Sequence, residues 1–569
     1  MNPLTMLAIV LGVLLVGLLI VLLARTLSFP VETEPVEPLE LDEIDGESVA
    51  QRIGLAVQYR TIANVDPDKT DPLPFEGFRE LLRTLYPQVD EYLSCEVINH
   101  HALLYTWKGN DPSLEPVCFT AHQDVVPADE SENSGWTHPP FGGVLEDGYV
   151  WGRGTLDCKG TLIGILEAVN NLLKSGYQPE RTVFLAFGDD EEVSGSQGAR
   201  AIVETLQSRG VKLSFLLDEG GSVMKGSVPG VDKPIGLIGI SEKGYLTLRL
   251  KSKVNSGHSS TPPEHTAIGA LGLAIATLES NPFPQRLEVA QFMMSYLGKD
   301  LPFGQRMQYA NSWLFGGALK RKLASRPVTN AITRTTAAPT MIRAGSAENV
   351  LPAEADALVN FRIMAGETIG DVYETVNDMV GDEVVEVLPA HGDTLEGDQA
   401  WNPTPVSDVD SAQFERLSEL IQAAFPGISV APFMMTGASD ARHYAPICQN
   451  AFRFSPYFLT LEDSQAVHGV NERLSFLNAG RMVAFFRELI KQVSSLGPEA
   501  DLEDEEEEEE EPELPEIQPE AEPIARPAKK ASRPEKETPE TLPDLENPQD
   551  LEPLPEDDAP LEVKPMKKE

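Results

Sequence analysis

Three apolar runs in this sequence end in side chains of the types that can bind metal ions. The endings are His122-x-Asp124 in "FTAHQDVVP" (119–127), the acidic run in "FGDDEEVSG" (187–195), and the acidic pair in "LLDEGG" (216–221). Imidazole and carboxylate groups are costly to bury unless they are paired or bound to a metal ion. Three such endings in chain order therefore predict that histidine and carboxylate groups converge at one metal site.

The runs before these endings have the composition of buried strands. "TVFLAF" (182–187) and "LSFLLD" (213–218) are short and apolar, and the segment before them, 161–176, carries its leucines on one face of a helix. Strands that alternate with helices predict an α/β domain with a largely parallel sheet. In such a domain the loops at the carboxyl ends of the strands carry the site.

The pattern changes near residue 240, which predicts a second domain inserted into the first. Residues 244–254 alternate in polarity like a half-exposed antiparallel strand, 349–364 have a similar character, and 366–381 have the pattern of an amphipathic helix. We therefore expect an inserted α+β lid or dimerisation domain. The expected boundaries are 48–239 and 393–497 for the α/β domain and 240–392 for the insert.

The N-terminus has the composition of a membrane anchor. Leu4–Ala24 is 21 residues without a charge, which is long enough to cross a bilayer as a helix. A cleaved signal peptide is the alternative, but its apolar core would be shorter and no clear A-x-A cleavage site follows. We expect a transmembrane helix at 1–25 and a linker at 26–47. The protein would then cross the membrane once, with its globular part on the extracytoplasmic or lumenal side.

The chain is strongly acidic, with a net charge of −44. Residues 501–569 hold 26 Asp or Glu against 8 Lys or Arg, and the rest of the chain still carries a net charge of −26. The tail at 498–569 is expected to be disordered, because it cannot bury enough apolar surface to offset its ordering entropy. The acidic balance argues against binding to nucleic acid and against charge-driven binding to an anionic membrane surface.

Further motifs occur in order along the globular part of the sequence. They are "WGRGTLDCKG" (151–160), "GHSSTPP" (257–263), "ENVLPAEADALVNFRI" (348–363), "GASDARHY" (437–444) and "VHGVNERL" (467–474). With the three strand endings, they resemble the signature of the M20 family of zinc metallopeptidases. The resemblance is closest to the carboxypeptidase S and N-acyl-amino-acid amidase branch, and it extends over residues 48–495.

The resemblance implies two zinc ions in each chain. The implied ligands are His122 and Asp218 for one metal, Glu192 and His468 for the other, and Asp157 as the bridge between them. Asp218 and Glu219 are adjacent alternatives, because strand alternation sends them to opposite sides and only one can face the metals. We expect Asp218 to be the ligand.

The resemblance also implies catalytic roles for two acidic residues. Glu191 would be the general base, which takes a proton from water and passes it to the leaving nitrogen. Asp124 would orient the ring of His122 through its second nitrogen. A cis peptide bond is implied between Asp157 and Cys158, and Cys158 is expected to be structural.

Substrate contacts are implied for both domains. In the insert, His258 would donate a hydrogen bond to the oxyanion, often across a dimer interface, and Asn349 and Arg362 would contact the substrate carbonyl or carboxylate. An ordinary capped turn and a strand-surface arginine are the alternatives for His258 and Arg362. In the α/β domain the candidates are Gly437, Arg442 and His443.

The leading hypothesis is a membrane-anchored zinc hydrolase of an amide bond beside a free carboxylate. Its substrates would be short peptides or N-acyl amino acids, and a homodimer would form through the insert. One alternative is aminoacylase or aminopeptidase specificity, since a free α-amine would need an acidic anchor in place of Arg362. Another is a non-catalytic metal-binding scaffold, which the acidic tail and the anchor would suit.

Overall fold

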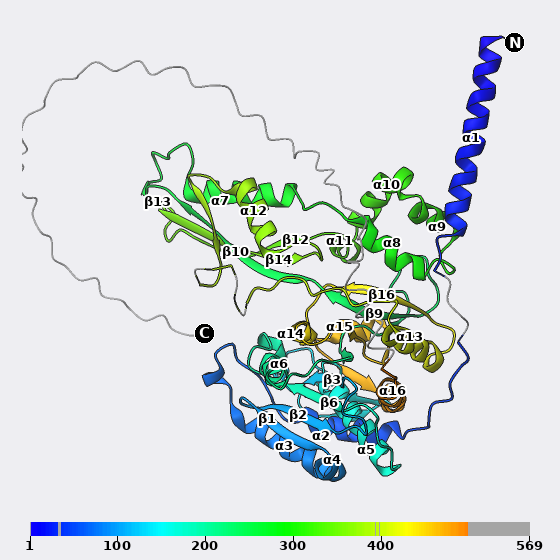
Figure 1. Cartoon of the computed structure of the whole chain (residues 1–569). Coiled ribbons are helices and arrows are strands. Elements are labelled where there is room, and N and C mark those ends of the chain that lie inside the picture. The colour runs from blue at the N-terminus through cyan, green and yellow to red at the C-terminus, as the bar shows by residue number, and fades with distance from the viewer. Residues whose placement is uncertain are drawn as a thin grey trace, which may run out of the picture. The chain divides into compact units, whose positions relative to one another are not determined.

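A mixed sheet of ten strands forms the centre of the main domain (Figure 1). The structure is a computed structural model, and it describes residues 2–498 apart from 32–35, 132, 393, 396 and 398. The strand order is β1-β2-β6-β3-β7-β17-β9-β8-β18, and β16 pairs with β9. The strands are β1 (Ser94–Ile98), β2 (Ala102–Trp107), β3 (Val117–His122), β6 (Val183–Gly188), β7 (Phe215–Asp218), β8 (Val223–Met224), β9 (Ile235–Glu242), β16 (Ser429–Met435), β17 (Ala451–Arg453) and β18 (Phe458–Leu459).

Helices cover both faces of this sheet, which is why its central strands β3 and β6 are buried along their whole length. In β3, Val117 and Phe119 pack into the core that contains α5 and α16, whereas Cys118 packs with α6 on the other face. The helices of this domain are α2 (Gly46–Val57), α3 (Pro72–Leu85), α4 (Pro87–Tyr92), α5 (Lys159–Lys174), α6 (Ala199–Ser208), α13 (Ala412–Ala424), α14 (Ala441–Tyr444), α15 (Leu461–Ala466) and α16 (Phe476–Ser494), with 3₁₀ turns at η1 (Pro67–Lys69) and η2 (Glu191–Val193). A small sheet joins β4 (Val144–Glu146), β5 (Tyr149–Trp151) and β19 (Arg473–Ser475).

The inserted segment contains a separate antiparallel sheet, here called the lid. Its strand order is β12-β14-β10-β15, and α7 and α12 cover its apolar face. The lid elements are β10 (Gly244–Lys253), β12 (Thr336–Ala344), β14 (Glu354–Ile363), β15 (Val385–Pro389), α7 (Ala267–Ser280) and α12 (Ile369–Val380), with a short ribbon of β11 (Gly257–His258) and β13 (Val350–Leu351). The expected α/β fold with an inserted antiparallel domain is confirmed.

Four helices inside the insert leave the lid sheet and pack elsewhere. They are α8 (Leu287–Tyr296), α9 (Phe303–Ala310), α10 (Ser312–Ala324) and α11 (Pro327–Ala331). Apolar side chains of α8, α9 and α10 share a core with Ile235 of β9 and Ala431 of β16, so the main sheet supports these helices. Within the apolar segment 281–304, Phe283 packs in the core of the lid sheet, whereas the buried residues from Leu287 to Leu301 belong to this second cluster.

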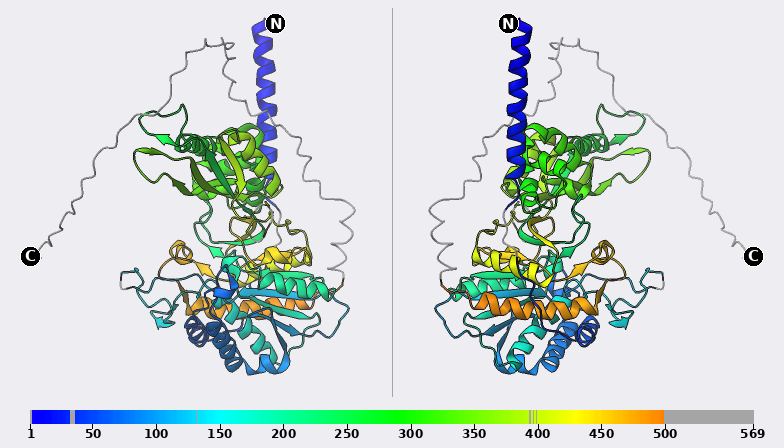
Figure 2. Two further views of the ribbon diagram at one scale, coloured as in Figure 1. Left: turned by 90° about the vertical axis from the view of Figure 1, so that its left-hand side faces the viewer. Right: turned by 90° about the vertical axis from the view of Figure 1, so that its right-hand side faces the viewer.

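The N-terminal apolar segment is one helix, α1 (Pro3–Leu27), which has a mean hydropathy of 3.3 over its most apolar window. Within α1 only Leu22 and Thr26 are buried, and both lie near its C-terminal end. Figures 1 and 2 show this end of α1 beside α9 while the rest of the helix extends away from the protein. The acidic tail lies outside the described residues.

Candidate metal centre

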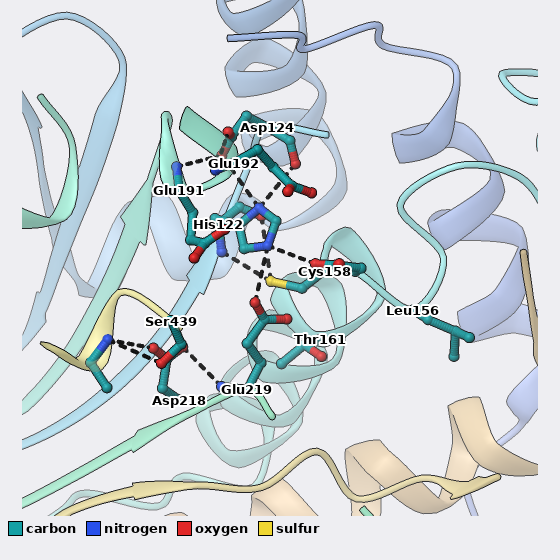
Figure 3. A network of polar contacts seen from close by, with 12 residues as sticks. His122, Asp124, Leu156, Cys158, Thr161, Glu191, Glu192, Asp218, Glu219 and Ser439 are labelled. Carbon is teal, nitrogen blue, oxygen red and sulfur yellow. Dashed lines mark hydrogen bonds and ion pairs between the residues drawn. The ribbon is translucent and has the colours of Figure 1, made fainter. Parts of the chain in front are cut away.

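The candidate site lies where neighbouring parallel strands of the main sheet end. Strand β3 runs parallel to β6 and β7, and its last residue, His122, pairs with Gly188 at the end of β6. The loops that follow these strands carry the acidic residues predicted from the sequence (Figure 3). The carboxyl ends of parallel strands meet at one edge, so these distant segments become neighbours.

Two histidines and three carboxylates form a compact cluster at this edge. The Nε2 atom of His122 lies 2.9 Å from Oδ1 of Asp157 and 3.2 Å from Oε1 of Glu219. The Nε2 atom of His468 lies 3.0 Å from Oδ2 of Asp157 and 3.1 Å from Oε2 of Glu192. Asp157 therefore presents one oxygen to each histidine, which is the arrangement of a bridging ligand.

The structure brings Glu219 rather than Asp218 into this cluster. Figure 3 shows Glu219 directed toward His122, whereas Asp218 is directed toward the segment that contains Ser439. Asp218 is already engaged, because its Oδ2 accepts a hydrogen bond of 2.7 Å from the amide of Ala441 and its Oδ1 accepts one of 2.8 Å from the amide of Glu219. This geometry favours Glu219 over Asp218, the ligand expected from the sequence, because strand alternation leaves Glu219 on the side that faces His122.

The donor set fits metal cations. The Nδ1 atom of His122 lies 3.0 Å from the carbonyl oxygen of Asp124, so a neutral ring that donates there turns the lone pair of Nε2 toward the carboxylates. Burial and the neighbouring Asp157 carboxylate raise the pKa of Glu219 to about 8. Hydrogen bonds to Asp157 and to a second carboxylate raise the pKa of His468 to about 10. Converging lone pairs and crowded carboxylates are stabilised by a bound cation, and imidazole with carboxylate is a donor set that zinc accepts.

Asp124 holds the turn that carries Glu191 and Glu192. Its two carboxylate oxygens accept hydrogen bonds from the amide of Glu191, at 3.1 Å, and from the amide of Glu192, at 3.0 Å. Asp124 is completely buried and also lies beside the ring of His122, so one side chain orients groups from two loops. Burial raises the pKa of the Glu191 carboxyl, and Nη1 of Arg442 lies 3.7 Å from it. A largely buried carboxyl with a raised pKa, beside a cluster of candidate metal ligands, is suited to accept and return a proton.

A glutamate that sequence reasoning did not single out fixes the loop of Asp157. The Oε1 atom of Glu472 accepts hydrogen bonds from the amides of Gly154, Leu156 and Asp157, at 3.0, 2.9 and 3.2 Å. Its Oε2 atom lies 2.6 Å from Nη1 of Arg153, and both side chains are buried. The signal was present in the motif "VHGVNERL", because Glu472 follows the candidate ligand His468 by four residues.

Replacing Glu472 by glutamine should destabilise the protein by about 3 kcal/mol, because the Arg153 guanidinium would stay buried without its counter-charge. Urea unfolding followed by circular dichroism measures this change. Glu462→Gln is the matched control, since Glu462 pairs with Arg473 at the surface and should change stability by less than about 1 kcal/mol. Equal stability of the two variants would contradict the assigned role of Glu472.

A pair of stacked rings between two arginines joins the main domain to the lid. The guanidinium of Arg442 lies 4.5 Å from the ring centroid of Trp401, which stacks on Tyr245 at 4.8 Å. Arg362 of β14 lies over the other side of this pair, 4.7 Å from the Tyr245 ring. No local pattern in the sequence predicts the contact between Tyr245 and Trp401, because it depends on the return of the chain from the lid. The stack places both predicted arginines in one row that begins beside Glu191.

His258 and Asn349 are not brought to the cluster of histidines and carboxylates in their own chain. They lie on the exposed β11 and β13 ribbon at the tip of the lid (Figure 1), where the amide of Ser259 donates to the carbonyl oxygen of Asn349 at 3.1 Å. The Nδ1 atom of His258 accepts a hydrogen bond of 3.1 Å from the amide of Ser260. Within the described residues, neither side chain has a hydrogen bond or ion pair with this cluster of histidines and carboxylates.

The remaining predicted residues surround the cluster in different ways. His443 is half-buried, and its Nε2 atom lies 3.0 Å from the carbonyl oxygen of Ser194, just after the turn of Glu191 and Glu192. Gly437 is exposed in the loop before α14. The peptide bond between Asp157 and Cys158 is cis, as the resemblance implied, and Cys158 is buried with its Sγ atom accepting a hydrogen bond from the amide of His122 at 3.0 Å.

Comparison with known proteins gives one consistent result. Residues 118–492 match the sequence pattern of "Peptidase family M20/M25/M40". The chain is 37% identical over 488 residues to the probable carboxypeptidase S-like 2 of Dictyostelium discoideum, an alignment that covers 84% of this chain and 92% of that protein. It is also 37% identical over 458 residues to the N-fatty-acyl-amino acid synthase/hydrolase PM20D1 of Homo sapiens, covering 79% and 89% of the two chains.

Solved structures show the same fold. The crystal structure of an M20 family metallo-carboxypeptidase from Sulfolobus solfataricus superposes with a TM-score of 0.56 at 17% sequence identity, covering 79% of this chain and 99% of that one. Human carnosine dipeptidase 1 superposes with a TM-score of 0.53 at 16% identity, covering 79% and 97%. At these identities the superpositions establish the fold.

Proposed function

Because this chain belongs to peptidase family M20/M25/M40, we propose that it is a di-zinc hydrolase that cleaves the amide bond beside a free carboxylate in short peptides or N-acyl amino acids. The family membership makes it a metallopeptidase, with relatives named as carboxypeptidase S-like proteins and as N-fatty-acyl-amino acid hydrolases. The identity of the metal, the count of two ions and the substrate class are the proposed parts.

The proposed zinc ligands are the five side chains of the cluster, with Glu219 in place of Asp218. They are His122, Asp157, Glu192, Glu219 and His468. When bound, zinc ions supply Lewis-acid polarisation of the scissile carbonyl and lower the pKa of a water to about 7.

The chain's own side chains move the proton and keep the ligands in place. The Glu191 carboxylate accepts the proton of the attacking water and delivers it to the leaving nitrogen. Asp124 keeps the turn of Glu191 and Glu192 in register with the ring of His122 through its hydrogen bonds to their amides.

The observation that supports recognition of a carboxylate is the pair of arginines in the aromatic stack. Arg362 is half-buried over Tyr245 and has no acidic partner within the described residues. Arg442 lies at the other end of the stack beside Glu191. A guanidinium that lacks an acidic partner near the reacting groups offers a fork of donors that matches a substrate carboxylate.

Replacing Arg362 by alanine should lower kcat/KM by about 10- to 100-fold for an N-acyl amino acid, because a charge-assisted hydrogen bond to the carboxylate is lost. The same variant should hydrolyse the C-terminally amidated analogue nearly as well as the wild type does. Steady-state kinetics on the acid and the amide measure this difference. Arg249→Ala, an exposed arginine on β10 of the same sheet, is the control. Equal losses on both substrates would reject carboxylate recognition by Arg362.

A homodimer through the lid is part of the proposal. His258 and Asn349 are exposed at the lid tip, so their side chains are available to a second copy of the chain. In such a dimer His258 would reach the oxyanion in the partner's site. Exposure of these two polar side chains on a short ribbon is the supporting observation.

The proposed location is a membrane, with α1 as a single uncleaved span. The helix has 25 residues, of which the 21 from Leu4 to Ala24 carry no charge, and most of its side chains are exposed. The length matches a bilayer core of about 30 Å, which about 20 helical residues cross. The catalytic domain would lie on the extracytoplasmic or lumenal side.

A further inference from the structure

One stretch of this acidic chain has the opposite charge. Between Leu301 and Ala347 the sequence contains seven Lys or Arg and no Asp or Glu, although the whole chain carries a net charge of −44. This stretch includes α9, α10 and α11. The net charge of the whole chain therefore does not describe this segment, which is locally basic. The charge near a surface determines which charged groups that surface attracts.

Helix α10 combines these basic groups with exposed apolar ones. In its first turns Trp313 is 57% exposed and Leu314 is 46% exposed. Its last turn and the residues after it expose Lys320, Arg321, Lys322 and Arg326, none of which has a carboxylate within ion-pair distance in the described part of the chain. The opposite side of α10 is the buried one, which faces the core shared with α8.

The described structure attaches this helix to the end of α1. The Nε atom of Arg25 donates a hydrogen bond of 3.1 Å to the carbonyl oxygen of Ala310. The Nδ2 atom of Asn311, the residue just before α10, donates to Oγ1 of Thr26 at 3.2 Å and lies 3.3 Å from the carbonyl oxygen of Leu22. Asn311, Thr26 and Leu22 are buried, so this contact is closely packed. It fixes the position of α10 along the axis of α1.

That level coincides with the surface of a bilayer that α1 spans. About 20 helical residues cross the hydrocarbon core of about 30 Å, which places the region from Pro3 to Leu22 in the core. Residues Leu22–Leu27, where α9 and α10 attach, then lie at the height of the lipid headgroups. Exposed tryptophan and leucine beside unpaired lysine and arginine are the side chains that this layer accommodates.

We propose that α10 is a second membrane contact, which rests on the proposed span α1 and binds an anionic lipid surface beside it. Trp313 and Leu314 insert at the boundary between headgroups and acyl chains. Lys320, Arg321, Lys322 and Arg326 contact the lipid phosphates and carboxylates. Two contacts, one spanning and one interfacial, hold the main domain and the lid at a fixed angle to the membrane.

Fluorescence quenching of Trp313 by brominated lipid tests this contact in the full-length protein. Helix α1 contains no tryptophan. Of the five tryptophans in the chain, Trp313 is exposed, and the other four are buried or half-buried. In vesicles of brominated phosphatidylcholine with phosphatidylserine, wild-type fluorescence should be quenched, and Trp313→Phe should lose most of that quenching. Equal quenching in Trp313→Phe and wild type, or no quenching in either, would overturn the proposal.

Matched triple variants test the role of the basic residues. Lys320→Gln with Arg321→Gln and Lys322→Gln should reduce the quenching in phosphatidylserine vesicles to the level seen in phosphatidylcholine alone. Lys108→Gln with Lys174→Gln and Lys212→Gln removes as many exposed charges from the main domain and should change nothing. Equal effects of the two triple variants would overturn the role of the basic residues.

Alkaline carbonate extraction of the same membranes separates this proposal from the anchor on which it rests. A chain that stays in the membrane pellet while its Trp313 is unquenched keeps the anchor and loses the α10 contact. That result would also be expected if an acidic protein segment, rather than lipid, covered the basic surface. A chain that carbonate releases contradicts both proposals.

Discussion

Glu191→Gln is expected to lower kcat by about 10²- to 10⁴-fold, the range that general acid–base catalysis contributes. Glutamine keeps the size of the side chain but cannot accept the proton of water. Metal content should not change, because the amide of residue 191 still donates to Asp124 and none of the five clustered side chains is altered. Release of the amino acid from an N-acyl amino acid or a dipeptide, together with metal analysis of the same preparation, measures both quantities.

The matched control is Glu204→Gln, which removes a carboxylate from the exposed surface of α6. It should leave kcat and metal content at wild-type values. Near-normal turnover of Glu191→Gln would refute the base assignment. A wild-type protein that binds zinc but turns over no peptide or N-acyl amino acid would instead favour the scaffold interpretation.

Glu219→Gln and Asp218→Asn are expected to affect different properties of the protein, although the two residues are adjacent. Glu219→Gln should purify with about one metal ion fewer per chain and lose most turnover, because its Oε1 atom faces His122 at 3.2 Å. Asp218→Asn should retain its metal and instead lose about 1–3 kcal/mol of stability, because Oδ2 of Asp218 accepts a hydrogen bond from the buried amide of Ala441.

Metal analysis by atomic emission and urea unfolding of both variants decide the question. His122→Ala provides the reference for the loss of one ligand, since both assignments place His122 on the same metal. If Asp218→Asn loses metal as His122→Ala does, while Glu219→Gln keeps a full complement, the original choice of Asp218 is restored. Loss of metal in both variants with unchanged stability would contradict the division of roles.

The amino-acid sequence by itself determined the local elements and the ligand types. Strands β3, β6 and β7 and helix α5 all lie where the apolar patterns predicted them. The periodicity of apolar side chains involves only residues near one another in sequence, so helices and strands can be recognised from it without knowledge of the fold. Carboxylates and imidazoles at strand ends were also recognisable from the sequence, because burying such a group costs free energy at any place in the fold unless it is paired or bound to a metal ion.

The tertiary structure decided which of two adjacent acids faces His122. The pattern of β7 requires Asp218 and Glu219 to point to opposite sides, but the side that each takes depends on Ala441, whose amide binds Asp218 from 223 residues away. Trp401 and Tyr245 likewise pair only after the chain has passed through the lid.

The surface of α10 shows the same division between composition and position. Its basic and aromatic residues can be counted in the sequence, but the net charge of −44 argued against a charged membrane contact. Only the packing of Asn311 against Thr26 and Leu22 places those residues at the end of α1. Composition is a sum over the residues of the chain and can be read from the sequence. The height of a side chain above a membrane is set by contacts between segments far apart in sequence, and those contacts exist only in the folded protein.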